Sequence, residues 1–271
     1  MNVFSFEKLM PGITRIMCPG NVYAFLVEGR DKAVLIDTGF GVCSLKEYVD
    51  SLTALPYEVL LTHGHLDHAG GAAEFEKVYL NEKDLPVAEL HTTLERRSPV
   101  FCGEGGLFTL DDMVPMKPLD EYLPLCDGQS FDLGGITVTM IELPGHTPGS
   151  MCVLIKELRV MILGDACNSL GYMFLPESLS IEEYFEALKN FRKYDGLYDT
   201  VLYSHPHNFG GKEIIEETIS LCEEVLMGKR AGIPHGTGRM GEPVFIAKEV
   251  DKNDRPLDGS CGNFIFRDNV R

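Results

Sequence analysis

The chain has 271 residues, of which 24 are Lys or Arg and 41 are Asp or Glu, so its formal net charge is −17. A surface this acidic repels phosphate backbones and anionic lipids, and we therefore expect no nucleic-acid partner and no membrane partner. No run of residues approaches the ~18 apolar positions that a membrane span requires. The first residues lack a basic region followed by an apolar stretch. We expect a cytoplasmic protein that acts on a small molecule.

The first third of the chain alternates β-rich and turn-rich pieces. Turn residues such as Pro19-Gly20-Asn21 recur at short intervals between them, which predicts antiparallel hairpins. A helical period of apolar residues follows, with Ser44 as its N-cap and Glu47 as the partner of a capping box. The predicted strands are 13–17, 22–27, 33–36, 59–62 and 78–80, and the predicted helices are 44–55 and 69–75.

Residues 81–130 are the least regular part of the chain. A helix is predicted over 85–95, but proline and glycine break the pattern repeatedly after it. An irregular insertion between two catalytic segments is where a lid or a substrate loop would lie, and a loop without such a role is the alternative.

Strands and helices then alternate again. The helix over 181–191 has Ser180 as its N-cap and Glu183 three residues later. Further predictions are strands over 136–141, 151–155, 160–163 and 200–203, a helix over 213–227, and a C-terminal hairpin extension within 240–271, built from 244–250 and 263–267. This order predicts one α/β domain over 1–271.

The eight cysteines are scattered and include no C-x-x-C pair. A chain of this length needs no disulfide staples, so we expect most of them to be buried thiols.

Residues 62–68 read Thr-His-Gly-His-Leu-Asp-His and carry most of the functional information. Imidazole and carboxylate groups are ligands of first-row divalent metals. At a strand end, His63 and His65 would project to the same side, while Asp67 and His68 turn away with the chain. A lone histidine is more often an ordinary surface or core residue, but this clustering favours a site for two metal ions.

Three more candidates follow predicted strands or the turns between them, namely His146, Asp165 and His205. Each alone is a weak signal, because a turn histidine is often simply exposed and an aspartate at a strand end often caps a neighbour. Their joint placement at strand ends is what a metal cluster at one sheet edge requires.

With these motifs the chain resembles the metallo-β-lactamase superfamily over roughly residues 12–228. Thr-His-Gly-His-Leu-Asp-His, Pro-Gly-His-Thr-Pro-Gly-Ser, Leu-Gly-Asp-Ala and a late histidine occur in the order that this family shows. The resemblance implies an α/β fold, a four-layer αββα sandwich of two mixed β-sheets flanked by helices, with a two-metal site at one edge.

The resemblance also implies a ligand set. The first metal would be held by His63, His65 and His146, and the second by Asp67, His68 and His205, with Asp165 bridging the two. Asp37 matches the family's early strand-end aspartate and would orient a ligating imidazole through its other nitrogen.

The last ligand departs from the family pattern. Many relatives have glycine before the final histidine, whereas this chain has Ser204-His205-Pro206-His207. The placement after a strand favours His205 as the ligand. His207 would then face the substrate and take part in catalysis, or be a bystander.

Two divalent ions of this kind can share a hydroxide and polarise a carbonyl oxygen. We expect zinc first, with manganese or iron as alternatives, and a metal-bridging hydroxide as the nucleophile. Asp67 would position the water or move its proton. Tyr172 is a candidate hydrogen-bond donor to a substrate carbonyl. The alternative is that it is an ordinary packing residue.

In its compact length the chain resembles the glyoxalase-type thioesterase and lactonase branches of this superfamily. This resemblance implies hydrolysis of an ester, thioester or lactone. The alternatives are a phosphodiesterase variant, an iron-dependent redox enzyme of the same fold (a sulfur dioxygenase or an oxygen reductase), and a metal-binding protein without turnover. A homodimer is left open.

Overall fold

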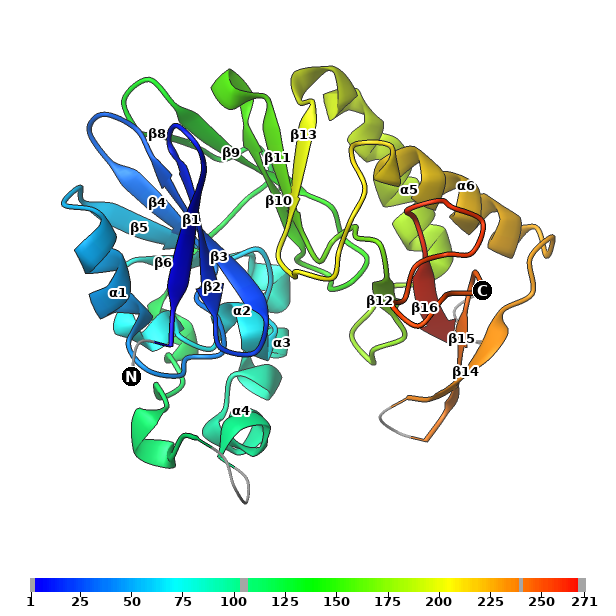
Figure 1. Cartoon of the computed structure of the whole chain (residues 1–271), viewed down its shortest axis with the longest axis horizontal. Coiled ribbons are helices and arrows are strands. Elements are labelled where there is room, and N and C mark those ends of the chain that lie inside the picture. The colour runs from blue at the N-terminus through cyan, green and yellow to red at the C-terminus, as the bar shows by residue number, and fades with distance from the viewer. Residues whose placement is uncertain (1–2, 103–106, 239–240, 268–271) are drawn as a thin grey trace. The chain divides into compact units, whose positions relative to one another are not determined.

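The computed structural model describes residues 3–102, 107–238 and 241–267. The chain divides into two compact units (Figure 1). The first consists of Met1–Met140 with Ser204–Pro206, and the second of Ile141–Tyr203 with His207–Arg271.

The first unit contains a seven-stranded sheet in the order β1-β2-β3-β4-β5-β6-β7. Its strands pair antiparallel up to β4 and parallel from there on. The predicted hairpins are confirmed, and the turn between β2 and β3 uses positive φ angles at Gly20 and Asn21. The strands are β1 (Ser5–Met10), β2 (Ile13–Cys18), β3 (Val22–Glu28), β4 (Ala33–Ile36), β5 (Tyr57–Leu60), β6 (Val78–Leu80) and β7 (Tyr122–Pro124).

Helix α1 (Leu45–Leu52) closes the core of the first unit. The predicted N-cap is confirmed, because the Ser44 hydroxyl accepts a hydrogen bond from Glu47 N at 3.1 Å. Leu45 and Val49 lie on its buried face, together with apolar side chains of β3, β4 and β5. The helix therefore anchors the strands whose far ends lead to Asp37 and to Thr62.

The helix predicted over 69–75 is wrong. The structure has α2 (Leu66–Ala69) followed by a 3₁₀ turn over Ala72–Glu74. Between them, Gly70 and Gly71 pass very close to other backbone: a Cβ on Gly70 would lie 2.4 Å from the Leu66 carbonyl oxygen, and one on Gly71 would lie 2.6 Å from that of Thr38. This close packing ends the helix, which begins three residues earlier than predicted.

Residues 81–130 contain short elements joined by loops. The helix predicted over 85–95 is interrupted, because α3 (Leu85–His91) ends before Thr92 and the Thr93 hydroxyl caps α4 (Leu94–Phe101). Short 3₁₀ turns follow, and strand β8 (Ser130–Asp132) ends the segment. β8 pairs with the start of β9 (Thr137–Glu142). Part of the predicted insertion, residues 103–106, lies outside the described residues.

The second unit continues from the end of β9 into β10 (Met151–Ile155), β11 (Val160–Gly164) and β13 (Thr200–Tyr203). β10 and β11 pair antiparallel, whereas β11 and β13 pair parallel. The two predicted helices are confirmed as α5 (Ile181–Phe191) and α6 (Ile214–Leu226), and Ser180 and Glu183 form the predicted capping box. Their apolar faces pack with β10 and β11 in one core.

A second sheet of this unit has the order β12-β16-β15-β14. β15 (Pro243–Ile246) and β16 (Phe264–Arg267) pair antiparallel, as predicted for the tail hairpin, although β15 ends four residues earlier than predicted. β12 (Gly171–Met173) and β14 (Ile233–Thr237) were not predicted. Residues 240 and 268–271 of the predicted extension lie outside the described residues.

All eight cysteines are free thiols and most are buried, as predicted. Within the described ranges, no helix combines the length and the apolar character that crossing a bilayer requires.

Cys18 makes a testable contribution to alkaline unfolding. Burial raises the pKa of its thiol from 9.0 to about 12. Between these values the unfolded chain releases this proton and the folded chain keeps it, so the free energy of unfolding falls as pH rises above 9. Relative to Cys18→Ala, the wild-type chain is expected to lose about 1 kcal/mol between pH 8 and pH 10. Urea unfolding at both pH values measures this loss. The exposed Cys126 is the control, and an equal change in Cys126→Ala would contradict the assignment to burial.

Candidate metal centre

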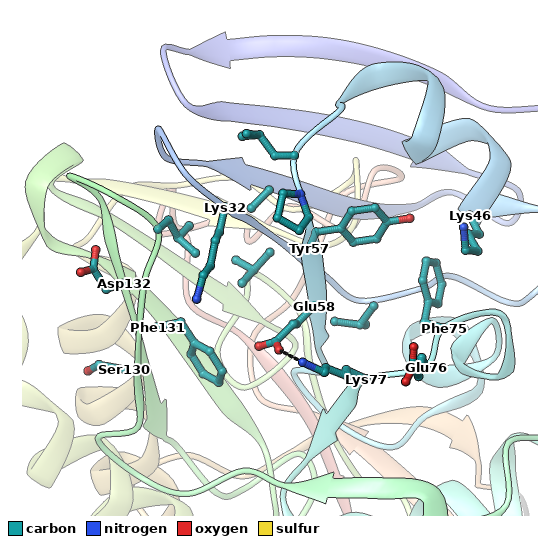
Figure 2. A pocket seen from close by; sticks show the side chains of 16 residues that line it. Lys32, Lys46, Tyr57, Glu58, Phe75, Glu76, Lys77, Ser130, Phe131 and Asp132 are labelled. Carbon is teal, nitrogen blue, oxygen red and sulfur yellow. Dashed lines mark hydrogen bonds and ion pairs between the residues drawn. The ribbon is translucent and has the colours of Figure 1, made fainter.

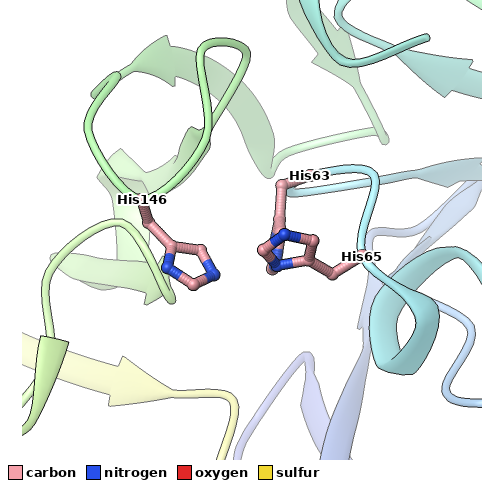
Figure 3. Close-up of side chains that lie close together, drawn as sticks. All are labelled: His63, His65 and His146. Carbon is pink, nitrogen blue, oxygen red and sulfur yellow. The ribbon is translucent and has the colours of Figure 1, made fainter. Parts of the chain in front are cut away.

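The segment after β5 brings two imidazoles together. His63 Nε2 lies 3.0 Å from His65 Nδ1, and both side chains are buried. Two nitrogens bound to one ion at ~2.0–2.1 Å stand roughly 3 Å apart, so this pair fits one divalent ion. Figure 3 shows the two rings next to each other on this segment, and the ring of His146 on the turn that follows β9.

Asp67 and His68 lie in the first turn of α2, whose N-cap is His65. The helix directs both side chains to the same group of atoms, since His68 Nε2 lies 3.6 Å from Asp67 Oδ2. His68 is fully buried, whereas the Asp67 side chain is 20% exposed. Asp67 is therefore the member of this pair that solvent can reach.

Asp37 lies directly behind His68. Its Oδ2 is 2.8 Å from His68 Nδ1, and its carboxylate also accepts hydrogen bonds from Thr62 N at 2.7 Å and from the Thr62 hydroxyl. Asp37 has a positive φ of 63°, a conformation that aspartate tolerates better than most residues. This arrangement holds the His68 ring by one nitrogen and leaves the other facing Asp67, as in the orientation of ligating histidines by carboxylates.

His205 completes a group of three donors in the first unit. The carbonyl of Ser204 accepts a hydrogen bond from Tyr23 N at 2.7 Å, which fixes the backbone next to β3. His205 Nδ1 lies 3.0 Å from the Asn21 carbonyl oxygen, and its Nε2 lies 3.5 Å from Asp67 Oδ2. One atom each from Asp67, His68 and His205 thus lie within 4.8 Å of one another.

Of the two late histidines, His205 is the one in this group. His207 is exposed and belongs to none of the potential metal-holding clusters found among the described residues.

His146 lies in the turn between β9 and β10 in the second unit. Its Nδ1 is 2.9 Å from the Tyr172 carbonyl oxygen, and the Ser178 hydroxyl donates to the His146 carbonyl at 3.0 Å. The contact of Tyr172 with His146 is made by its main chain, while its side chain is 42% exposed. The turn therefore fixes the His146 ring through one nitrogen, like those of His68 and His205.

Asp165 follows β11 directly. Its Oδ2 lies 3.9 Å from His146 Nε2, and its side chain is 12% exposed. Both residues thus belong to the same end of the strands of the second unit, with the carboxylate facing Nε2 of His146.

Two supporting residues were not predicted from the sequence. Asp84 is fully buried and its Oδ2 accepts a hydrogen bond from Gly64 N at 2.8 Å, between the two histidines. His91 is buried with its ring centroid 4.5 Å from that of His65. In the sequence Asp84 resembles an ordinary residue at a helix start, and a lone histidine such as His91 carries no signal.

The donor set fits divalent metal ions. It offers imidazoles and carboxylates with no thiolate, which suits zinc, manganese or iron. His68, His205 and His146 each have Nδ1 beside a protein oxygen. That contact sets the tautomer in which Nε2 can bind a metal.

A cavity of about 650 Å³ lies elsewhere in the first unit (Figure 2). It opens at the beginnings of β4 and β5, whereas the histidine segment follows the end of β5. Lys77 pairs with Glu58 at 3.0 Å on its wall, and the other lysines and acidic residues around it are equally balanced. None of the predicted site residues lines this cavity.

Comparison with known proteins identifies relatives over most of the chain. Residues 19–205 match the family model described as the metallo-beta-lactamase superfamily. Acyl-coenzyme A thioesterase MBLAC2 from Bos taurus is 28% identical over 211 residues, which cover 70% of this chain and 75% of that protein. The atrochrysone carboxyl ACP thioesterase nsrC from Aspergillus novofumigatus is 28% identical over 176 residues, which cover 61% of this chain and 46% of that protein.

Solved structures show the same fold. A metallo-beta-lactamase from Pontibacter korlensis matches with a TM-score of 0.57 and 16% identity, covering 81% of this chain and 99% of that one. A metallo-beta-lactamase from Erythrobacter litoralis matches with a TM-score of 0.56 and 19% identity, covering 83% and 98%. The predicted fold class is confirmed.

Mixed sheets with flanking helices carry histidine and aspartate donors beyond the strand ends. Together with the family match and the similarity to named thioesterases, these features place the chain among the metal-dependent hydrolases. The family model matches well over half of the residues. The chain belongs to the metallo-beta-lactamase superfamily.

Proposed function

We propose that the chain hydrolyses an acyl thioester with the help of two bound divalent metal ions. The group of Asp67, His68 and His205 carries this proposal, because it offers three donors in addition to the His63–His65 pair. A single-metal site would need only one of these sets. The names of the relatives, acyl-coenzyme A thioesterase and atrochrysone carboxyl ACP thioesterase, support a thioester as the bond that is cleaved.

The proposed ligands are those of the family pattern. His63, His65 and His146 would hold one ion, and Asp67, His68 and His205 the other, with Asp165 shared. The place of His146 and Asp165 in this set rests on the order of the motifs within the matched residues 19–205. Zinc is the proposed metal, with manganese or iron as alternatives. When bound, such ions lower the pKa of a water and polarise a carbonyl oxygen.

The reaction adds water to the acyl carbon, breaks the carbon–sulfur bond and releases a carboxylate and a thiol. Thiols have a pKa of about 8.5, so the thiolate can leave without prior protonation, and no strong general acid is needed. Asp67 is proposed to orient the attacking water or accept its proton, since its carboxylate is partly exposed and lies beside two ring nitrogens. The exposed side chains of His207 and Tyr172 are proposed to contact the substrate.

A substrate screen tests this function. Protein loaded with zinc or manganese is expected to hydrolyse acyl-coenzyme A thioesters faster than lactones, phosphodiesters or β-lactams, with thiol release followed by a colorimetric thiol reagent. Chelation should abolish the activity, and re-added metal should restore it. An Asp67→Asn variant should be strongly impaired, and metal analysis of the same sample separates loss of the second ion from a catalytic defect with both ions bound. Preferred hydrolysis of another bond, or one iron per chain with oxygen consumption, would refute the proposal.

A further inference from the structure

Large apolar side chains are exposed on one segment of the first unit. Among the described residues, four of the nine exposed large hydrophobic side chains lie between 90 and 110. Val100 is 53% exposed, Leu107 79% and Leu110 58%. Single exposed apolar residues are ordinary, whereas several that gather on one surface are typical of binding sites.

Three half-buried aromatic rings form a cluster in the same part of the structure: Phe101 and Phe108, which adjoin these residues in the chain, and Phe40. The ring centroid of Phe101 lies 5.0 Å from that of Phe40 and 6.0 Å from that of Phe108. Phe40 comes from the loop after β4, so the cluster links that loop to α4 and the segment after it. We call Phe40, Val100, Phe101, Leu107, Phe108 and Leu110 the apolar patch.

The apolar patch reaches the turn that anchors His205. Gly20 lies against two of its rings: a Cβ on Gly20 would stand 2.5 Å from Phe40 and 3.1 Å from Phe101. The next residue, Asn21, holds His205 through its carbonyl oxygen. The patch therefore begins one residue away from the anchor of a proposed metal ligand.

The patch is also held in place by a buried cation. The guanidinium of Arg97 donates to the carbonyl oxygens of Phe40 at 2.7 Å and Val114 at 2.6 Å. These bonds tie α4 to the loop that carries Phe40, so the rings are fixed by the backbone beneath them. A surface ordered in this way loses little conformational freedom when it binds a ligand.

We propose that the apolar patch binds the hydrocarbon chain of an acyl thioester, so that the enzyme prefers medium or long chains to short ones. This inference rests on the proposed function. Phe40 and Phe101 lie against Gly20, and the neighbouring Asn21 contacts His205, so an acyl chain whose carbonyl is held near His205 can reach these rings. Complete burial of one methylene strengthens binding by about fourfold. A methylene that is only partly buried on an open surface contributes a smaller factor.

Two measurements test the proposal. For the wild-type protein, kcat/KM is expected to rise at least about tenfold from butanoyl- to dodecanoyl-coenzyme A, which eight partly buried methylenes can supply. In Leu107→Ser/Leu110→Ser most of this rise should be lost, while butanoyl-coenzyme A is hydrolysed as before. Leu257→Ser removes an exposed leucine that is 60% accessible outside the patch, and should behave as wild type. Phe101→Ala probes the ring cluster independently.

The second measurement does not need catalysis. Non-hydrolysable S-dodecyl-coenzyme A should bind more tightly than S-butyl-coenzyme A by calorimetry, and the double variant should lose the difference. Thioester hydrolysis that is independent of chain length in all variants would overturn the patch and leave the proposed function intact. Chain-dependent binding of the thioethers without hydrolysis of any thioester would support the patch and refute the proposed function.

Discussion

Replacing His205 by alanine is expected to remove one of two bound metal ions per chain and to lower activity at least a hundredfold. His205 Nε2 and His68 Nε2 lie 3.5 and 3.6 Å from the same Asp67 oxygen, so the variant leaves only two of three proposed donors. Loss of a partner that merely orients a ligand already costs 10–100-fold in affinity or activity. Metal analysis by mass spectrometry, with a thioesterase assay on the same samples, measures both effects.

His207→Ala is the matched control, because it removes the same side chain two residues later. His207 is exposed and lies outside the donor group, so the variant should keep both metal ions. A lower kcat with full metal content would agree with a substrate contact. Two ions retained in His205→Ala and one lost in His207→Ala would overturn the ligand assignment.

Replacing Arg97 by methionine is expected to lower the free energy of unfolding by roughly 3–5 kcal/mol. The guanidinium is fully buried and donates to three main-chain carbonyls, those of Thr92, Phe40 and Val114. Burial lowers the pKa of Arg97 to about 10, so the group is still charged at neutral pH. Methionine fills similar space but leaves the three carbonyl oxygens without these donors.

Urea unfolding at pH 7 measures the effect, and Arg96→Met supplies the control because Arg96 is exposed on the same helix. Arg97→Lys should recover only part of the loss, since one ammonium group cannot reproduce the planar three-way contact. An unfolding free energy of Arg97→Met within about 1 kcal/mol of Arg96→Met would show that the loop and α4 hold together without the cation.

The sequence was most informative where chemistry and periodicity agree. Strands β2, β3, β4, β6, β10 and β11 follow from short β-branched runs between turn residues, and α5 follows from its apolar period and its capping box. The placement of Asp67, His68 and His205 in one group could be anticipated because similar donors follow strand ends. The metal-binding and catalytic roles of all the predicted site residues, and the single domain over 1–271, stay predictions.

What the sequence could not predict depends on contacts distant in the chain. α2 ends at Ala69 because Gly70 packs against the backbone of Phe40, thirty residues away. Asp84 supports Gly64, and Arg97 joins Phe40 to Val114, but neither residue belongs to a local pattern. Short edge strands such as β12 and β14 carry too few apolar residues to be distinguished from loops.

The Asp37 carboxylate also bears on how the enzyme acquires its metals. It fixes His68, while the Asn21 carbonyl fixes His205. Because oxygen atoms of the protein set these rings, their orientation is built into the folded chain rather than imposed by an ion. Metal uptake at the proposed sites then requires little reordering, so ions should load into the folded protein. Which ion enters the proposed second site would then depend on supply as well as on affinity.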